Sequence, residues 1–140
     1  MKIAICGSLD FTYQMKEIAD KLQNSGYEVV IPHGARLILS GETTIEAIRK
    51  AGGEQKRSAD VIRYYYGEIQ KSDAILVLNY DKRDIPNYIG GNTLMEIGFA
   101  HVLYKKIFLL NPIPEIPYYQ SEIEAVKPVV INGDLGKIGQ

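Results

Sequence analysis

A glycine-rich turn that leads into an apolar segment holds the residues best suited to chemistry. The turn consists of Gly90, Gly91, Asn92 and Thr93, and Glu96 follows as the only carboxylate between Thr93 and Tyr104. Backbone N–H groups at a helix N-terminus favour an anion, and glycines let a ligand approach closely. A partly desolvated glutamate beside such a turn acts as a nucleophile toward an electrophilic carbon, or as an acid or base with a shifted pKa.

The same segment has an alternative explanation in local helix structure. Thr93–Glu96 matches the capping box, in which a glutamate at the third helical position bonds back to the N-cap amide. Asn92 or Thr93 would then be the N-cap of an ordinary turn. Glu96 therefore either caps its own helix or does chemistry.

Composition narrows the class of protein. The chain has 140 residues and a net charge of -1, which favours one domain over residues 1–140 and gives no basic stripe for nucleic acid. No apolar run approaches the roughly 20 residues of a membrane helix, and Met1–Cys6 resembles a strand rather than a signal peptide. A single cysteine, Cys6, excludes an intramolecular disulfide and a cysteine zinc cluster. We expect a cytoplasmic protein without membrane contact.

No cofactor is indicated by the motifs. The chain lacks a GxGxxG fingerprint and a P-loop lysine, so NAD binding and ATP hydrolysis have no support. His33 and His101 are too isolated for a metal site. We therefore expect neither a metal nor an organic cofactor.

Alternating strand and helix patterns predict an α/β fold. Five β-branched runs are apolar throughout, as expected for strands covered on both faces, at Ile3–Cys6, Tyr27–Ile31, Ala74–Leu78, Ile107–Leu110 and Pro128–Ile131. Helical periodicity lies between them, at Phe11–Asn24, Glu54–Lys71, Thr93–Tyr104 and Glu115–Val126. This order predicts a flavodoxin-like, doubly wound, five-stranded parallel sheet. Pro32–Gly53 is predicted to be a lid or an extra helix.

Ligands of such sheets bind beyond the carboxyl ends of the strands. Gly7 and Ser8 follow the first strand, and Asn111 follows the fourth. We expect Glu96, in the first turn of its helix, to open onto a cleft shared with Gly7 and Ser8. Ser8 and Asn111 are candidates for binding phosphate or sugar, and Phe11 is a candidate for stacking on a base. Asp81–Asp84 is predicted to be a solvated, mobile loop.

The segment Gly91–Ala100, followed by Lys105–Ile107, resembles the nucleoside 2-deoxyribosyltransferase-like family. Cys6–Ser8 and Ser72–Val77 are similar to it as well, especially to the branch that hydrolyses 2'-deoxynucleoside 5'-monophosphates. The resemblance excludes Pro32–Gly53. It implies a flavodoxin-like fold and a glutamate nucleophile that attacks C1' of deoxyribose. The base then leaves, and a second base or water takes the sugar. Glu96 is the position that matches this nucleophile.

Two positions depart from the family pattern. The family has an aspartate, on the helix before the third strand, that helps bind the sugar and protonate the base. Tyr65 occupies that position here, and Glu68 lies one turn further on as a substitute. The tyrosine that members often carry near the end of the first strand is also missing. The Gly-Gly-x-Thr-x-x-Glu spacing is similar, in addition, to lysine-decarboxylase-like phosphoribohydrolases, which also cut a nucleotide N-glycosidic bond.

The interpretation from sequence is therefore cleavage or transfer at the N-glycosidic bond of a nucleoside or nucleotide. One alternative is hydrolysis of another N-glycoside, such as a ribonucleotide or NAD. The alternative from a different class is a regulatory domain that binds a nucleotide without catalysis, as Tyr65 suggests.

A homo-oligomer is predicted from the family resemblance and from aromatic residues that look exposed, namely Tyr64, Tyr66, Tyr118 and Tyr119. We expect at least a dimer in which Tyr118 and Tyr119 lie close to the neighbour's site. Light scattering at micromolar concentration measures the mass directly. A monomeric mass would show the prediction to be wrong.

Overall fold

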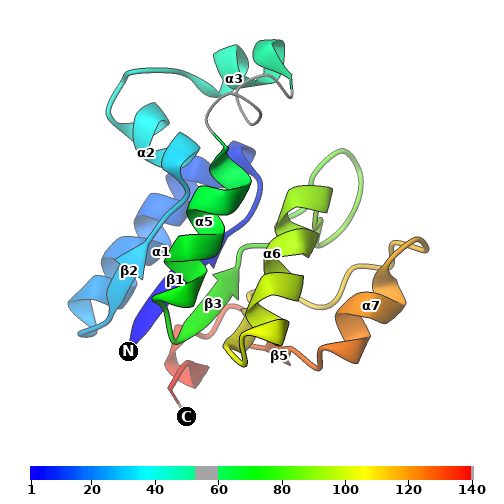
Figure 1. Cartoon of the computed structure of the whole chain (residues 1–140). Helices are drawn as coiled ribbons and strands as arrows, with labels where there is room; N and C mark the ends of the chain where they lie inside the picture. Colours follow the sequence, from blue (N-terminus) through cyan, green and yellow to red (C-terminus); the bar gives the residue numbers. More distant parts are fainter. Residues whose placement is uncertain (53–59, 140) are drawn as a thin grey trace.

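Five parallel strands in the order β2-β1-β3-β4-β5 form the centre of the computed structural model, which describes residues 1–52 and 60–139 (Figure 1). The strands are β1 (Lys2–Cys6), β2 (Glu28–Val30), β3 (Ala74–Val77), β4 (Lys106–Leu109) and β5 (Val129–Val130). Every neighbouring pair is parallel. The predicted flavodoxin-like strand order is confirmed.

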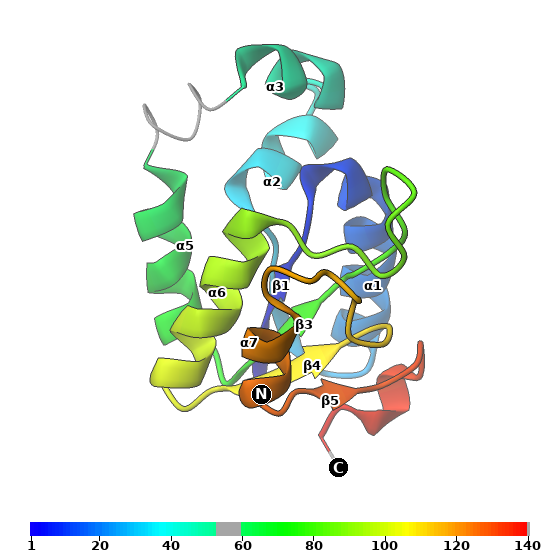
Figure 2. The ribbon, with the colours of Figure 1, turned by 90° about the vertical axis from the view of Figure 1, so that its right-hand side faces the viewer.

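Helices cover both faces of this sheet. The helix α1 (Thr12–Asn24) lies on one face, and the other face carries α5 (Val61–Gln70), α6 (Gly91–Val102) and α7 (Gln120–Ala125). Figure 2 shows α1 on one side of the strands and α5 and α6 on the other. Short 3₁₀ helices occupy Leu9–Phe11 and Leu135–Lys137.

The central strand β1 contributes to two cores because its side chains alternate between the faces of the sheet. Ile3 and Ile5 pack with α1, whereas Ala4 and Cys6 pack with α5 and α6. All four are fully buried. This double burial explains why the runs are apolar throughout instead of alternating.

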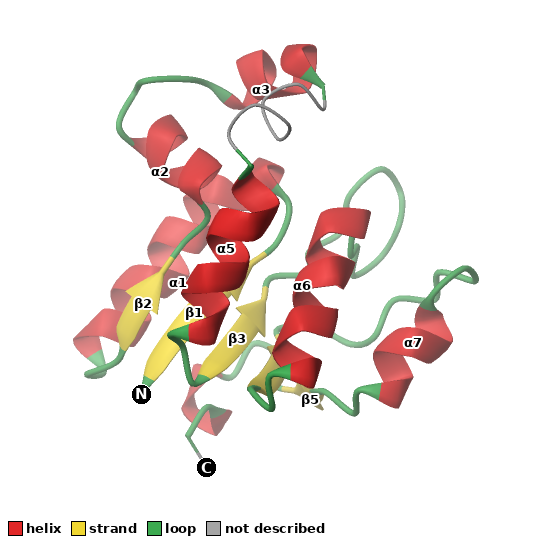
Figure 3. Ribbon diagram, viewed as in Figure 1, coloured by secondary structure: helices red, strands yellow, loops and turns green. Residues whose placement is uncertain are grey.

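The segment predicted to be a lid or an extra helix forms two short helices, α2 (His33–Leu39) and α3 (Ile45–Ala51). They lie above the carboxyl edge of the sheet (Figure 1). Ala35 joins the core on the α1 face, and Thr44 caps α3 by accepting a hydrogen bond from the Ala47 amide at 3.0 Å. Figure 3 shows the loop that joins α2 to α3.

The helix α5 begins at Val61, after the N-cap Asp60, which accepts a hydrogen bond from the Arg63 amide. The predicted start at Glu54 lies outside the described residues. Tyr65 and Ile69 are buried, as the periodicity predicts. Within residues 1–52 and 60–139, every helix is too short or too polar to span a bilayer.

The start of α6 differs from the predicted N-cap at Asn92 or Thr93 and from the predicted capping box over Thr93–Glu96. The N-cap is Gly90, which makes no side-chain capping bond, and the Gly90 carbonyl accepts the first helical hydrogen bond from the Leu94 amide at 2.9 Å. Thr93 is consequently a buried residue inside the helix, so the capping-box interpretation is wrong. Glu96 lies in the second turn and not the first, because the helix begins two residues earlier than predicted.

A glycine on the outer side of α6 gives a test of the helix itself. Gly98 is exposed, and a Cβ there would meet no atom within 4 Å. Gly98→Ala should raise the free energy of unfolding by about 0.5–1 kcal/mol, because alanine loses less backbone entropy in a helix. Gly90→Ala is the contrasting variant. Its Cβ would lie 3.0 Å from the Tyr88 hydroxyl, so it should not gain the same stability. Urea denaturation measures both, and a lower midpoint for Gly98→Ala would contradict the placement.

Candidate functional site

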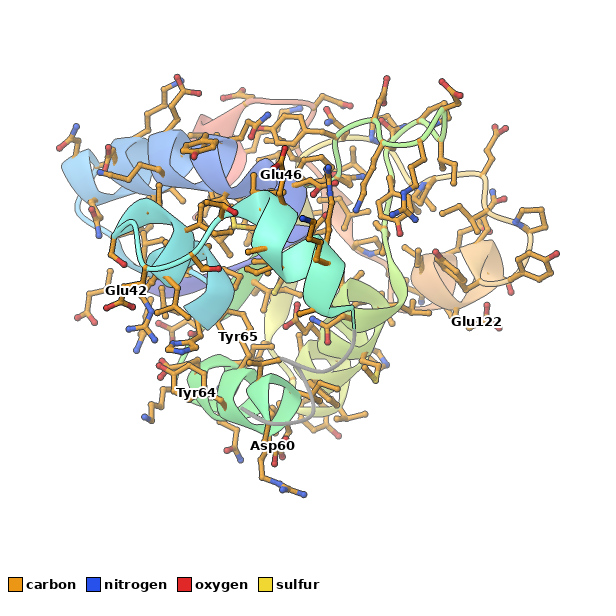
Figure 4. The ribbon with its side chains drawn as sticks, turned by 90° about the horizontal axis from the view of Figure 1, so that it is seen from above. Glu42, Glu46, Asp60, Tyr64, Tyr65 and Glu122 are labelled. Atoms are coloured by element: carbon orange, nitrogen blue, oxygen red, sulfur yellow. The ribbon has the colours of Figure 1, made fainter. Side chains whose placement is uncertain are left out.

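A cavity of about 280 Å³ lies at the carboxyl edge of the sheet, enclosed by the strand ends, α2, α3, α5 and α6. Its volume is close to the lower end of the range for small-molecule sites. Most of the sequence-predicted site residues line it together: Gly7, Ser8, Tyr65, Gly90, Gly91, Asn92, Thr93 and Glu96. Figure 4 looks onto this edge from above and shows α3 lying across it.

Glu96 combines burial with access to the cavity. Glu96 is only 5% exposed, yet it is one of the residues that line the cavity. The Cys6 thiol lies close enough for the Glu96 charge to act on it, and Cys6 Sγ lies 4.0 Å from the Ala4 carbonyl oxygen. Burial raises the pKa of the Cys6 thiol, and the neighbouring Glu96 raises it further. The thiol therefore stays protonated at neutral pH and is not a nucleophile there.

Tyr65 lines the same cavity, but its hydroxyl is already engaged. It donates to the Ile5 carbonyl at 2.5 Å and lies 3.2 Å from the Val30 carbonyl. Burial raises the pKa of the Tyr65 phenol well above its usual value, and nearby Cys6 and Glu96 add to the rise. Tyr65 thus joins α5 to the ends of β1 and β2 as a neutral phenol. In Figure 4 its side chain lies between α5 and the sheet, while Tyr64 points outward.

The remaining candidates from the sequence lie elsewhere in the described residues. Glu68 is paired with Lys2 Nζ at 3.8 Å, at the amino end of β1 and so at the opposite edge of the sheet. Phe11 is buried, with its ring edge-on to Tyr80 at a centroid distance of 5.2 Å. Neither Glu68 nor Phe11 is among the residues that line the cavity.

Asn111 is held by a neighbouring strand end. Its amide N–H donates to Asn79 Oδ1 at 2.9 Å, and its Nδ2 donates to the Asn79 carbonyl at 3.1 Å. Asn79 Nδ2 in turn donates to the Asn111 carbonyl at 2.9 Å. These bonds join the ends of β3 and β4, and Asn111 does not line the cavity.

Three charged residues of the cavity were missed from the sequence. Asp10 Oδ2 lies 3.1 Å from Lys82 Nζ, and Asp10 Oδ1 lies 2.9 Å from Arg49 Nη2. Lys82 was predicted to belong to a solvated, mobile loop, but its side chain is only 18% exposed. Asp10 and Lys82 follow the ends of β1 and β3, which is a signal that could have indicated them. Arg49 has no such signal, because only the path of α3 brings it over the cavity.

These contacts set the charge on Asp10. Burial raises the pKa of the Asp10 carboxyl, but hydrogen bonds and charges from Arg49 and Lys82 outweigh this effect and lower the pKa below its usual value. Asp10 is therefore ionised at neutral pH. Within the described residues, no group of three histidine, cysteine, aspartate or glutamate side chains could hold a metal ion.

The first turn of α6 adds backbone hydrogen-bond donors to this site. Gly91, Asn92 and Thr93 occupy the first helical positions, where backbone N–H groups have no helical acceptor. All three residues line the cavity. Together with the helix dipole they favour a negatively charged or hydroxyl-bearing group next to Glu96.

Comparison with known proteins shows the fold. No protein-family model matches the chain, and no curated protein sequence matches it. Among solved structures, a CMP N-glycosidase from Clostridium botulinum, BcmB, matches with a TM-score of 0.52 and 15% sequence identity. The match covers 93% of this chain and 85% of that chain. This chain has the α/β fold of that enzyme, and the resemblance to the nucleoside 2-deoxyribosyltransferase-like fold is confirmed at that level.

The lowered pKa of Asp10 gives a pH-dependent prediction. A carboxyl whose pKa is lower in the folded protein stabilises it above the unfolded pKa of about 3.9, and this contribution is lost as the pH falls through the folded value. Asp10→Asn should therefore lower the free energy of unfolding at pH 7, by up to about 1 kcal/mol because the pairs are partly exposed. The difference from wild type should shrink below about pH 4.

Urea denaturation at pH 7 and pH 3 measures this difference. Asp20→Asn is the matched control, because Asp20 pairs with Lys16 on the exposed side of α1 and should change stability by less than about 0.5 kcal/mol. An equal loss from Asp10→Asn at both pH values would contradict the assignment of charge.

Proposed function

We propose that the cavity binds a nucleoside or nucleotide and that the protein cleaves or transfers its N-glycosidic bond with Glu96 as the nucleophile. The observation that carries the proposal is a buried carboxylate that lines the cavity next to the first turn of α6. Two further points support it: the sequence of α6 resembles a family with a glutamate nucleophile, and the fold is shared with a CMP N-glycosidase.

In the proposed reaction, a Glu96 oxygen attacks C1' of the sugar while the bond from C1' to the base nitrogen breaks. The base takes up a proton, which we assign to water because the Tyr65 hydroxyl donates to a main-chain carbonyl. The resulting glycosyl ester is resolved by water in hydrolysis or by a second base in transfer. Either hydrolysis or transfer restores the free Glu96 carboxylate.

The surroundings of Glu96 suit this role. The protonated thiol of Cys6 lies beside the carboxylate. Burial limits the water that would otherwise compete with a substrate for the carboxylate oxygens. The backbone N–H groups of Gly91–Thr93 and the hydroxyl of Ser8 are proposed to hold the phosphate or the sugar hydroxyls, and Gly7 to form the neighbouring wall.

A second function, nucleotide binding without catalysis, is favoured by one observation. Tyr65 stands where the family has its acid aspartate, and its proton is used by the Ile5 carbonyl. A protein of this kind would bind the same ligands and release no base. For either function we propose a cytoplasmic homo-oligomer that needs no cofactor.

Replacing the proposed nucleophile separates these functions. Glu96→Gln should lower the rate of base release by several orders of magnitude, equivalent to about 4 kcal/mol or more of activation free energy. Nucleotide binding should largely remain, because the carboxylate bonds to the substrate only along the reaction path. Chromatography of a panel of nucleosides and nucleotides, with deoxyribose and ribose sugars, measures the released base.

Glu122→Gln is a matched control, because Glu122 is exposed on α7 and lies far from α3 in the view of Figure 4. It should release base at the wild-type rate. An unchanged rate for Glu96→Gln would falsify the catalytic assignment. Binding without release by the wild-type protein would establish the second function instead.

A further inference from the structure

Two cations share one carboxylate at the side of the cavity. Lys82 and Arg49 both contact Asp10, at 3.1 Å and 2.9 Å. Asp10 brings one negative charge to the two positive charges that contact it, and Glu46 on α3 is a further carboxylate whose charge acts on Arg49. An anionic group on a ligand is the natural complement to these two cations.

Lys82 is held in place before any ligand arrives. Its Nζ donates to Ser8 Oγ at 2.8 Å and lies 5.1 Å from the centroid of the Tyr88 ring. These contacts, with the ion pair to Asp10, fix a side chain that is otherwise flexible. A cation already ordered in a cavity costs less entropy when it binds an anion.

Donors from separate parts of the chain converge here. Ser8 Oγ accepts from Lys82 and from the Asp10 amide, which leaves its own hydrogen available to donate. The first-turn N–H groups of α6 line the same cavity. An ammonium has three hydrogens and a guanidinium five, so both cations can keep Asp10 and still bind a ligand.

We propose that Lys82 and Arg49 are specificity-determining residues that select substrates carrying a phosphate monoester, and that Asp10 is the counter-ion they share in the empty cavity. This inference rests on the proposed function, and it favours nucleoside 5'-monophosphates over nucleosides. Arg49 lies in the segment outside the family resemblance, so the selection belongs to this chain's own α3. Lys82 has the larger effect, because its side chain is 18% exposed and that of Arg49 is 59% exposed.

Calorimetry tests the selection directly. Dissociation constants are measured for AMP, GMP, CMP, UMP, their 2'-deoxy forms and the matching nucleosides, in the full chain with Glu96→Gln to prevent turnover. At least one monophosphate should bind tenfold or more tightly than its nucleoside. Lys82→Met should weaken that monophosphate at least tenfold and change the nucleoside less than about twofold. Arg49→Gln should produce a smaller loss of the same kind.

Lys16→Met serves as the matched control, because Lys16 pairs with Asp20 on the surface of α1 and does not line the cavity. It should leave both affinities unchanged. Added salt should weaken the monophosphate more than the nucleoside, because salt screens charge interactions. If Lys82→Met fails to fold, Arg49→Gln carries the test alone, since its side chain is mostly exposed.

Three results would overturn the inference: equal affinity for every monophosphate and its nucleoside, equal losses for both ligands in Lys82→Met, or no binding across the panel. The base-release assay keeps the two proposals apart. Phosphate-dependent binding through Lys82 without release would retain this inference and reject the proposed reaction. Release of base from nucleosides and monophosphates at equal efficiency would support the proposed reaction and reject the selection for phosphate.

Discussion

Parallel pairing of β1 with β2 and β3 is the constraint on which the rest of the structure depends. Ile5 pairs with Leu76 and Cys6 with Val77, so the two central strands end at the same edge. Because all strands run the same way, each must be followed by a crossover that begins at this edge. The loop after β1, which carries Ser8, and the loop after β3, which carries Lys82 and Gly90, are consequently brought together, although they are far apart in the sequence.

Burial of a carboxylate beneath this edge is the main energetic cost of the site. Removing a charge from water is unfavourable unless hydrogen bonds replace the lost solvent. Glu96 lies beside the protonated Cys6 thiol, in a helix whose N-terminus is close by. The nearby phenol of Tyr65 is held on the backbone, so the surroundings of Glu96 are ordered before a ligand binds.

The helix α3 adds Arg49 to the charged side of the cavity. The helices α2 and α3 lie over the carboxyl edge (Figure 1), and in the described part of α3 no residue is buried. Its links to the rim include the ion pair of Arg49 with Asp10. A helix attached through a partly exposed ion pair depends on salt and on pH more than one attached by a core. Arg49, which is proposed to bind the ligand, is therefore also one of the residues that hold α3.

The sequence by itself determined the architecture and the residue of greatest chemical interest. Apolar runs without alternation require strands covered on both faces, and strands that alternate with helices require parallel crossovers. Gly90–Thr93 next to Glu96 could be recognised because the motif is local. The same local reasoning placed the start of α6 two residues too late, since a glycine N-cap leaves no side-chain signature.

The tertiary structure alone decided which side chains near the strand ends face the cavity. Phe11 and Asn111 follow strand ends as Ser8 does, yet one turns into the core and the other pairs with Asn79. Arg49 meets Asp10 across 39 positions of sequence, and no periodicity encodes that meeting. The spacing of apolar residues indicates which side of a helix or strand faces the core, because several residues along the element share that side. The direction of a single side chain at a strand end depends on its neighbours in space, and these are fixed only when the chain has folded.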